Sequence, residues 1–207
     1  GWGKDKGDQA LKIMDEEKWL TGSATESSEE TFYISIPANV KELRVMLYWH
    51  DKAASPTSAK SLVHDIDLNV ETPDGVIHLP WVLNNNPSAD LLDSPAGIGA
   101  DHLNNMEQVF ISNPAAGNYD FHVNGFEIPF TEQEYYIVYS YAFDELKLTF
   151  PNGGESFAPT DQIQIHWEAL GSSSEFKLEY SSNNGNSWNP LTILPGHLRQ
   201  FLWTVPD

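Results

Sequence analysis

Residues 62–75, LVHDIDLNVETPDG, decide the fold of this chain. Its apolar and polar residues alternate, and successive side chains of a β-strand point to opposite faces of a sheet. One face can therefore join a core through Leu62, Ile66, Leu68 and Val70. The other face gathers the oxygen-bearing side chains of Asp65, Asp67, Asn69 and Glu71. Pro73-Asp74-Gly75 is a turn signal that ends the strand.

Most of the chain around this strand also has β composition. Short apolar segments separated by Pro, Gly, Asn and Asp predict strands at 32–36, 43–49, 76–79, 106–111, 119–123 and 135–143. Many short strands of this kind indicate an all-β sandwich or jelly roll. Residues 8–19 predict one short N-terminal helix, 21–30 a polar connector, and 84–105 a long ordered loop.

A second β unit is predicted from residue 145 onward. Residues 162–167 and 176–180 alternate as strands, and Asn183-Asn184-Gly185 predicts a hairpin turn. The pattern resembles an immunoglobulin-like or fibronectin-type-III-like sandwich. It leaves room for about five strands where such a fold has roughly seven. We therefore expect this module to be incomplete and the natural chain to continue.

Charge and composition exclude several classes of partner. The 207 residues include 30 acidic and 11 basic side chains, a formal net charge of -19. This charge repels nucleic acids and anionic membranes and attracts divalent cations. The chain has no cysteine, which excludes disulfides and thiolate zinc sites. No apolar run approaches the roughly 20 residues that a membrane span needs.

Three segments taken in order resemble a known family. Residues 43–51 (LRVMLYWHD), the 63–75 strand and turn, and 104–111 (NNMEQVFI) are similar to the β-jelly-roll domain that follows the catalytic domain in secreted subtilisin-like serine proteases. The related P-domain of proprotein convertases shares the strand and turn pattern. Gly1-Trp2-Gly3 and the helix after it look like the end of a subtilase catalytic domain, although Asp5-Lys6 departs from the family pattern.

This resemblance implies an organisation and a role. Residues 1–20 would be the remnant of the last catalytic helix, 21–144 the jelly roll, and 145–207 an accessory module similar to the Pro-Asn-Gly-Gly-Glu repeats of bacterial surface and secreted proteins. It implies a protein secreted from, or displayed on, a bacterial cell. The partner would be an upstream protease domain in cis, with a protein or polysaccharide substrate.

The same sequence argues against catalysis by this piece. The subtilase Gly-Thr-Ser nucleophile segment and a Gly-x-Ser-x-Gly elbow are both missing from it. An alternative is a carbohydrate-binding or cell-surface-binding adhesion module, with the loop aromatics Trp81 and Trp188 as ligand contacts. The aromatic run 135–143 is first of all a central strand, because it alternates.

Calcium is the cofactor that the oxygen-rich residues predict, because it takes six to eight hard oxygen ligands. The candidate ligands are Asp51, Asp65, Asp67, Asn105 and Glu107. Asp65 and Asp67 lie about 7 Å apart along a strand, so another segment must close over them, and 104–107 is the expected lid. Solvated acidic side chains are the alternative. His50 and His64 each precede an aspartate and suggest zinc, but hydrogen bonding is the commoner role of such pairs.

Overall fold

The computed structural model describes residues 7–169 and 174–206. The chain divides between Ala142 and Phe143 into two compact units. The expected Gly1-Trp2-Gly3 turn lies outside the described residues. Among these residues, no helix is long and apolar enough to cross a membrane.

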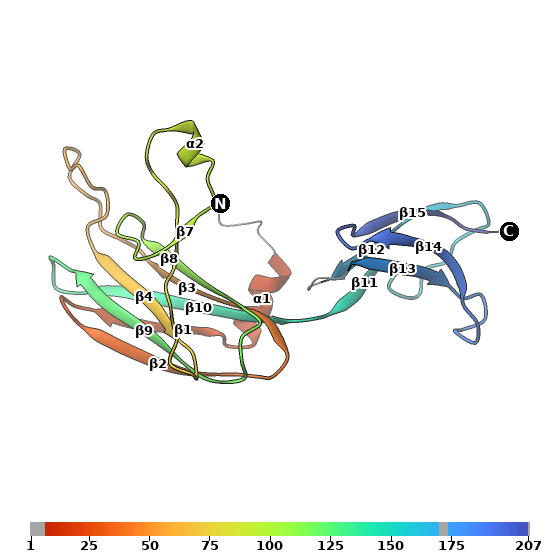
Figure 1. Ribbon diagram of the computed structural model, residues 1–207, viewed down its shortest axis with the longest axis horizontal. Helices are drawn as coiled ribbons and strands as arrows, with labels where there is room; N and C mark the ends of the chain where they lie inside the picture. Colours follow the sequence, from red (N-terminus) through yellow and green to blue (C-terminus); the bar gives the residue numbers. More distant parts are fainter. Residues whose placement is uncertain (1–6, 170–173, 207) are drawn as a thin grey trace. The chain divides into compact units, whose positions relative to one another are not determined.

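The first unit is a sandwich of two four-stranded sheets (Figure 1). One sheet has the order β1 (Trp19–Ala24), β10 (Gln133–Phe143), β3 (Val40–Trp49), β8 (Met106–Ser112). The other has the order β2 (Glu29–Ile36), β9 (Gly117–Glu127), β4 (Asp65–Glu71), β5 (Ile77–His78). The chain crosses between sheets in the order of a jelly roll, in which the first strand pairs with the last and the second with the one before it. The predicted all-β class is confirmed.

The core lies between the inward faces of these sheets. On β4 the alternation is as predicted, because Ile66, Leu68 and Val70 are fully buried while Asp67, Asn69 and Glu71 are partly exposed. The inward residues of β3 and β9 complete the core, among them Leu43, Val45, Leu47, Trp49, Tyr119, Phe121 and Val123. Each such side chain contributes about 1.5–3 kcal/mol on burial. The Trp49 indole also donates a hydrogen bond to the His64 carbonyl at 3.0 Å.

The N-terminal prediction was wrong in its boundaries. The helix α1 spans Gly7–Asp15, shorter than the expected 8–19. It ends because Glu17 takes a positive φ of 52°. The amide of Lys18 donates to the Ile13 carbonyl at 3.0 Å, the bond pattern of a Schellman C-terminus. Trp19 then starts β1, so most of the expected 21–30 connector is strand.

The strand at the centre of the sequence prediction also starts later than expected. Residues 62–64 lie outside β4, which begins at Asp65. The Asp51 carboxylate accepts the amides of Val63 at 2.7 Å and His64 at 2.9 Å. The Asp51 side chain therefore accepts the backbone hydrogen bonds that a neighbouring strand would otherwise accept.

The 84–105 loop is ordered around two short elements. The strands β6 (Trp81–Val82) and β7 (Gly97–Ile98) pair antiparallel and close the base of the loop. Between them lies the one-turn helix α2 (Ala89–Leu92), which projects away from the sheets in Figure 1.

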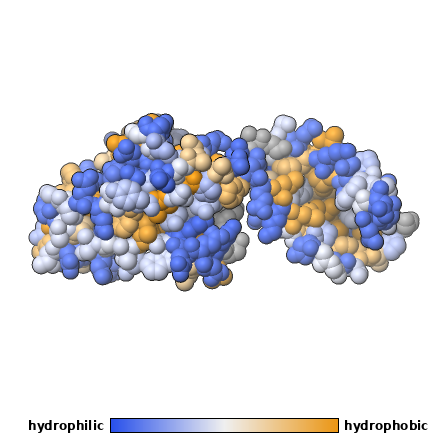
Figure 2. Space-filling view, turned by 90° about the horizontal axis from the view of Figure 1, so that it is seen from below, coloured by the Kyte–Doolittle hydropathy of each residue, from blue (hydrophilic) through white to orange (hydrophobic). Residues whose placement is uncertain are grey.

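The described residues of the second unit form five strands in two small sheets. One sheet orders β11 (Leu146–Phe150), β12 (Gln162–Ala169) and β15 (Gln200–Thr204), and the other pairs β13 (Glu175–Tyr180) with β14 (Asn189–Pro195). Ile163, Ile165, Trp167 and Phe176 form its core. Figure 2 shows hydrophobic residues on its surface. The exposed large hydrophobic residues of this unit are Phe143, Leu146, Leu148, Trp188, Ile193 and Leu202.

The predicted hairpin turn of this unit is stabilised locally. The Asn183 side-chain oxygen accepts the Ser187 amide and the Ser181 hydroxyl, each at 2.9 Å. The Asn183 amide group donates to the Ser187 hydroxyl at 2.8 Å.

The buried Trp49 gives a test of the core. Trp49→Phe removes the donor to the His64 carbonyl, and an unsatisfied buried acceptor costs about 1–3 kcal/mol. We expect the first unit to lose this much free energy of unfolding in urea, followed by circular dichroism. Trp188→Phe, at an exposed position of the second unit, should stay within about 0.5 kcal/mol. Equal losses in the two variants would contradict this account of the core.

Candidate cation site

The candidate site begins at one edge of β4, which pairs with β5 only in part, whereas its other edge pairs with β9 from Asp65 to Glu71. The short β5 pairs only with Val70 and Glu71, so it ends before it reaches Leu68. The Leu68 amide instead donates to Glu107 Oε2 at 2.6 Å. Glu107 is on β8, which belongs to the opposite sheet, and it is fully buried. A carboxyl group thus joins the two sheets where the strand ladder stops.

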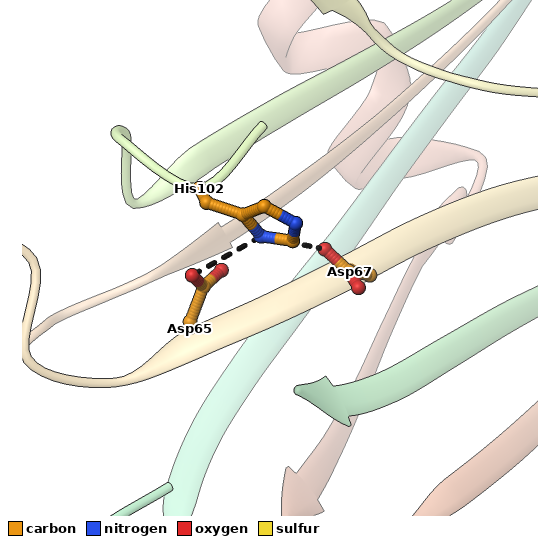
Figure 3. Close-up of side chains that lie close together, drawn as sticks. All are labelled: Asp65, Asp67 and His102. Atoms are coloured by element: carbon orange, nitrogen blue, oxygen red, sulfur yellow. Dashed lines mark ion pairs between the residues drawn. The ribbon is translucent and has the colours of Figure 1, made fainter. Parts of the chain in front are cut away.

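Three side chains converge beside this junction. Asp65 and Asp67 point from β4 toward His102, which comes from the loop before β8 (Figure 3). His102 Nδ1 lies 3.2 Å from Asp65 Oδ2 and 3.6 Å from Asp67 Oδ1. The ligand atoms of the three residues lie within 4.8 Å of one another. Neither approach of the imidazole has hydrogen-bond geometry.

Several polar atoms in this cluster are buried without a hydrogen-bond partner. They are Asp65 Oδ1, Asp67 Oδ1, His102 Nδ1 and Glu107 Oε1. The Asp65 side chain is 1% exposed, and only its Oδ2 has a hydrogen-bonding cation, Lys60 Nζ at 3.0 Å. Buried polar atoms are nearly always paired, and an unpaired one costs about 1–3 kcal/mol. Three of these atoms belong to the group of Asp65, Asp67 and His102, and a bound cation would give them a partner.

Burial also shifts the pKa values of the ionisable groups in and beside this cluster. Burial raises the pKa of Glu107 to about 9, opposed by the Leu68 amide and reinforced by the nearby charges of Asp67, Asp101 and Asp65. Burial also raises the pKa of Asp67, although His102 acts in the opposite direction. Burial opposes the charged form of Lys60, yet its contacts with Asp65 and Glu127 raise its pKa. A divalent cation would relieve this accumulation of negative charge.

The structure brings together some of the predicted ligands and not others. Asp65 and Asp67 meet in one group, and Glu107 lies in electrostatic range of both. The Asp51 oxygens are occupied by the backbone amides of the loop that follows it. The Asn105 side chain donates to the Trp49 carbonyl at 2.7 Å. Asp51 and Asn105 therefore hold backbone in place, and neither side chain joins the group.

Sequence reasoning missed His102. The sequence predicted that residues 104–107 close over Asp65 and Asp67. The residue that does so lies two positions earlier. Its ring stacks on Phe126, with centroids 4.1 Å apart, and this contact holds the imidazole over β4. In the sequence, His102 is only a histidine that follows an aspartate and precedes a predicted strand. This pattern is common in proteins and does not by itself predict a metal ligand.

The two histidines weighed for zinc do not form a metal group among the described residues. His64 Nδ1 is hydrogen-bonded to Gln133 Oε1 at 2.8 Å. The carbonyl of His50 accepts from Gln133 Nε2 at 3.2 Å.

The two aromatic candidates belong to different units. Trp81 lines a groove of about 580 Å³ beside β3 and β8. Trp188 follows the Asn183 turn of the second unit and is exposed.

Comparisons with known proteins assign no family to this chain. No family model matches it, and no curated protein matches it. A crystal structure of a protein from Sulfurospirillum deleyianum aligns with 59% of this chain and 97% of its own, at 10% identity and a TM-score of 0.30. A likeness of this size carries no argument about function.

The raised pKa of Glu107 predicts a pH dependence of stability in the presence of chelator. The folded chain keeps a proton on Glu107 that the unfolded chain loses above the ordinary value of 4.5. The folded state therefore binds more protons, and the free energy of unfolding should fall as pH rises from 4.5 to about 9. The slope can reach about 1.4 kcal/mol per pH unit.

Glu107→Gln should flatten this part of the pH profile, because the amide oxygen can still accept the Leu68 amide without ionising. Glu71→Gln, a change on the exposed face of β4, should keep the slope of the parent chain. Urea titrations at a series of pH values measure both. Superimposable profiles for the parent and Glu107→Gln would contradict the assignment.

Proposed function

We propose that this chain is a non-catalytic accessory region of an exported bacterial subtilisin-like serine protease, with a jelly-roll unit stabilised by a bound divalent cation. The protease part rests on the ordered motifs of the sequence. The cation part rests on one observation: the ligand atoms of Asp65, Asp67 and His102 lie within 4.8 Å of one another, and these residues together with Glu107 hold four buried atoms that have no hydrogen-bond partner. Proteolysis by the purified chain, abolished by substituting one of its serines or histidines, would contradict the non-catalytic role.

A cation at this position would stabilise the fold by linking separate elements. Asp65 and Asp67 belong to one sheet, Glu107 to the other, and His102 to the loop between β7 and β8. An ion that binds all of them links the two sheets and the loop. Because it binds only the folded state, it stabilises by mass action, by about 2.7 kcal/mol at a concentration one hundred times Kd.

Calcium is the ion that we propose, because the carboxylates of Asp65 and Asp67 supply hard oxygens at the site and the Glu107 carboxyl group lies in electrostatic range of both. Calcium needs further oxygens, which water and backbone carbonyls supply in many proteins. The imidazole nitrogen of His102 favours zinc as the alternative, since imidazole suits zinc better than calcium. Binding of zinc should depend on the His102 side chain, whereas binding of calcium should depend mainly on the carboxylates.

Added calcium should raise the melting temperature of the first unit above its value in chelator. Asp65→Asn combined with Asp67→Asn should abolish the rise, because neutral amides neither repel each other nor attract the ion as strongly. Glu71→Gln removes one charge from the same face of the same strand and should leave the rise intact. Differential scanning calorimetry in chelator and in millimolar calcium measures all three.

His102→Gln separates the two ions. A calcium site should keep most of its stabilisation in this variant, whereas a zinc site should lose it. If neither ion changes the melting temperature of the unmodified chain, the acidic face is solvated and the cation part of the proposal fails.

The exposed apolar side of α1 favours the proposal that a partner docks on this helix. Leu11 and Met14 are 63% and 67% exposed, and their spacing of three residues places them on one helix face. Trp19, at the start of β1, is exposed nearby in the sequence. An amphipathic helix normally covers such a face with a neighbour. We propose that the neighbour is the upstream catalytic domain.

This docking can be tested in the complete natural protein. Leu11→Ser with Met14→Ser should shorten the half-life of protease activity at elevated temperature, because the apolar contact is lost. Leu146→Ser, at an equally exposed apolar position of the second unit, is the matched control. Equal half-lives for the double variant and the control, or an enzyme unaffected by deletion of residues 21–143, would show that the region does not support the protease.

A further inference from the structure

A groove on the outer face of the first unit has the composition of a ligand site. Its floor is the outward side of β3 and β8, where Arg44 pairs in register with Phe110 and Gln108 lies two residues before Phe110. Trp81 of β6 and the chain around Asp93 form its walls. Its volume of about 580 Å³ falls within the range of small-molecule sites.

Backbone pairing and side-chain contacts fix the positions of the residues that line the groove. The β6 and β7 pair fixes Trp81, whose partner in the register is Ile98. The Gly99 amide donates to the Pro80 carbonyl at 3.0 Å and closes the base of the loop. On the floor, the Arg44 guanidinium lies 4.9 Å from the centre of the Phe110 ring and 3.1 Å from Glu42 Oε2. A preformed groove loses less conformational entropy on binding.

The wall formed by the loop is also ordered locally. The amides of Leu91 and Leu92 donate to the Ser88 carbonyl at 3.0 and 2.9 Å. Ser94 Oγ donates to the Leu91 carbonyl at 2.6 Å. These bonds place Asp93 and Ser94 at the rim of the groove.

The lining side chains indicate the chemistry of the ligand. Trp81 and Phe110 offer aromatic surfaces, while Arg44, Gln108 and Asp93 offer planar polar groups with both donors and acceptors. One basic and one acidic residue line the groove, in a chain whose net charge is -19. The strong single-sign charge that would select an anion or a cationic peptide is therefore missing here. A ligand with apolar ring faces and many uncharged hydroxyl groups fits this set.

We propose that the groove binds a neutral polysaccharide, with a sugar ring against the Trp81 indole and hydroxyl groups hydrogen-bonded by Gln108, Asp93 and Arg44. This binding uses none of the side chains of the cation site. It adds a targeting activity to the stabilising role, because the chain would retain its host protein on a polymer surface.

Affinity electrophoresis measures such binding with the whole chain. The gels contain one neutral polymer each: hydroxyethyl cellulose, soluble starch, laminarin, arabinoxylan or galactomannan. A gel with alginate, an anionic polymer, is included. We expect retardation by at least one neutral polymer and none by alginate. Trp81→Ala and Gln108→Ala should each weaken the affinity at least about tenfold, or 1.4 kcal/mol. Trp81→Phe, which keeps an aromatic face, should retain part of it.

Two controls separate loss of contact from loss of fold. Trp188→Ala removes an exposed indole from the second unit, and Tyr33→Ala removes an exposed ring from β2 in the other sheet. Both should bind like the parent, and the melting temperature of every variant is measured alongside. The proposal is overturned if none of the five neutral polymers retards the chain, if Trp81→Ala in a folded chain binds like the parent, or if only alginate retards it. These outcomes leave the cation proposal untouched, because that depends on different residues.

Discussion

The hydrogen bond from the Leu68 amide to Glu107 Oε2 is the constraint on which this end of the jelly roll depends. It exists because β5 is too short to pair with the whole of β4. A buried backbone amide needs an acceptor, and here the acceptor crosses from the other sheet. A carboxyl group must then be buried at the junction, where its pKa rises to about 9. The acidic face of β4 lies beside it, so the fold itself concentrates the charge that a cation would neutralise.

The sequence predicted what depends on local periodicity. The alternation in residues 65–71 placed Ile66, Leu68 and Val70 in the core and Asp67 on the other face, and both placements are confirmed. The strand segments of β2, β3, β8, β9 and β10 were predicted from short apolar segments bounded by Pro, Gly, Asn and Asp. The strand pattern predicted a sandwich or a jelly roll, because strands with one apolar face must cover that face, and the family resemblance favoured the jelly roll.

The errors come from contacts between residues far apart in the sequence. Asp51 has the residue type of a calcium ligand, yet it caps the backbone at Val63 and His64, which no local pattern reveals. His102 enters the site because the loop before β8 folds over β4 and because Phe126, on β9, supports its ring. The helix was predicted too long because Trp19 fits the helical period as well as a strand. Pairing with Val138 of β10 decides in favour of the strand.

β8 is the element that serves both candidate sites. Glu107, Val109 and Ile111 point into the sandwich, whereas Met106, Gln108 and Phe110 are partly exposed on its outer face. Adjacent residues, Glu107 and Gln108, therefore face the cation site and the groove respectively. Strand geometry gives one segment two chemically different surfaces without mixing them, since its period of two separates buried acid from exposed amide. A cation that fixes Glu107 would also fix the backbone that carries Gln108, so the two sites share a support while their ligands remain apart.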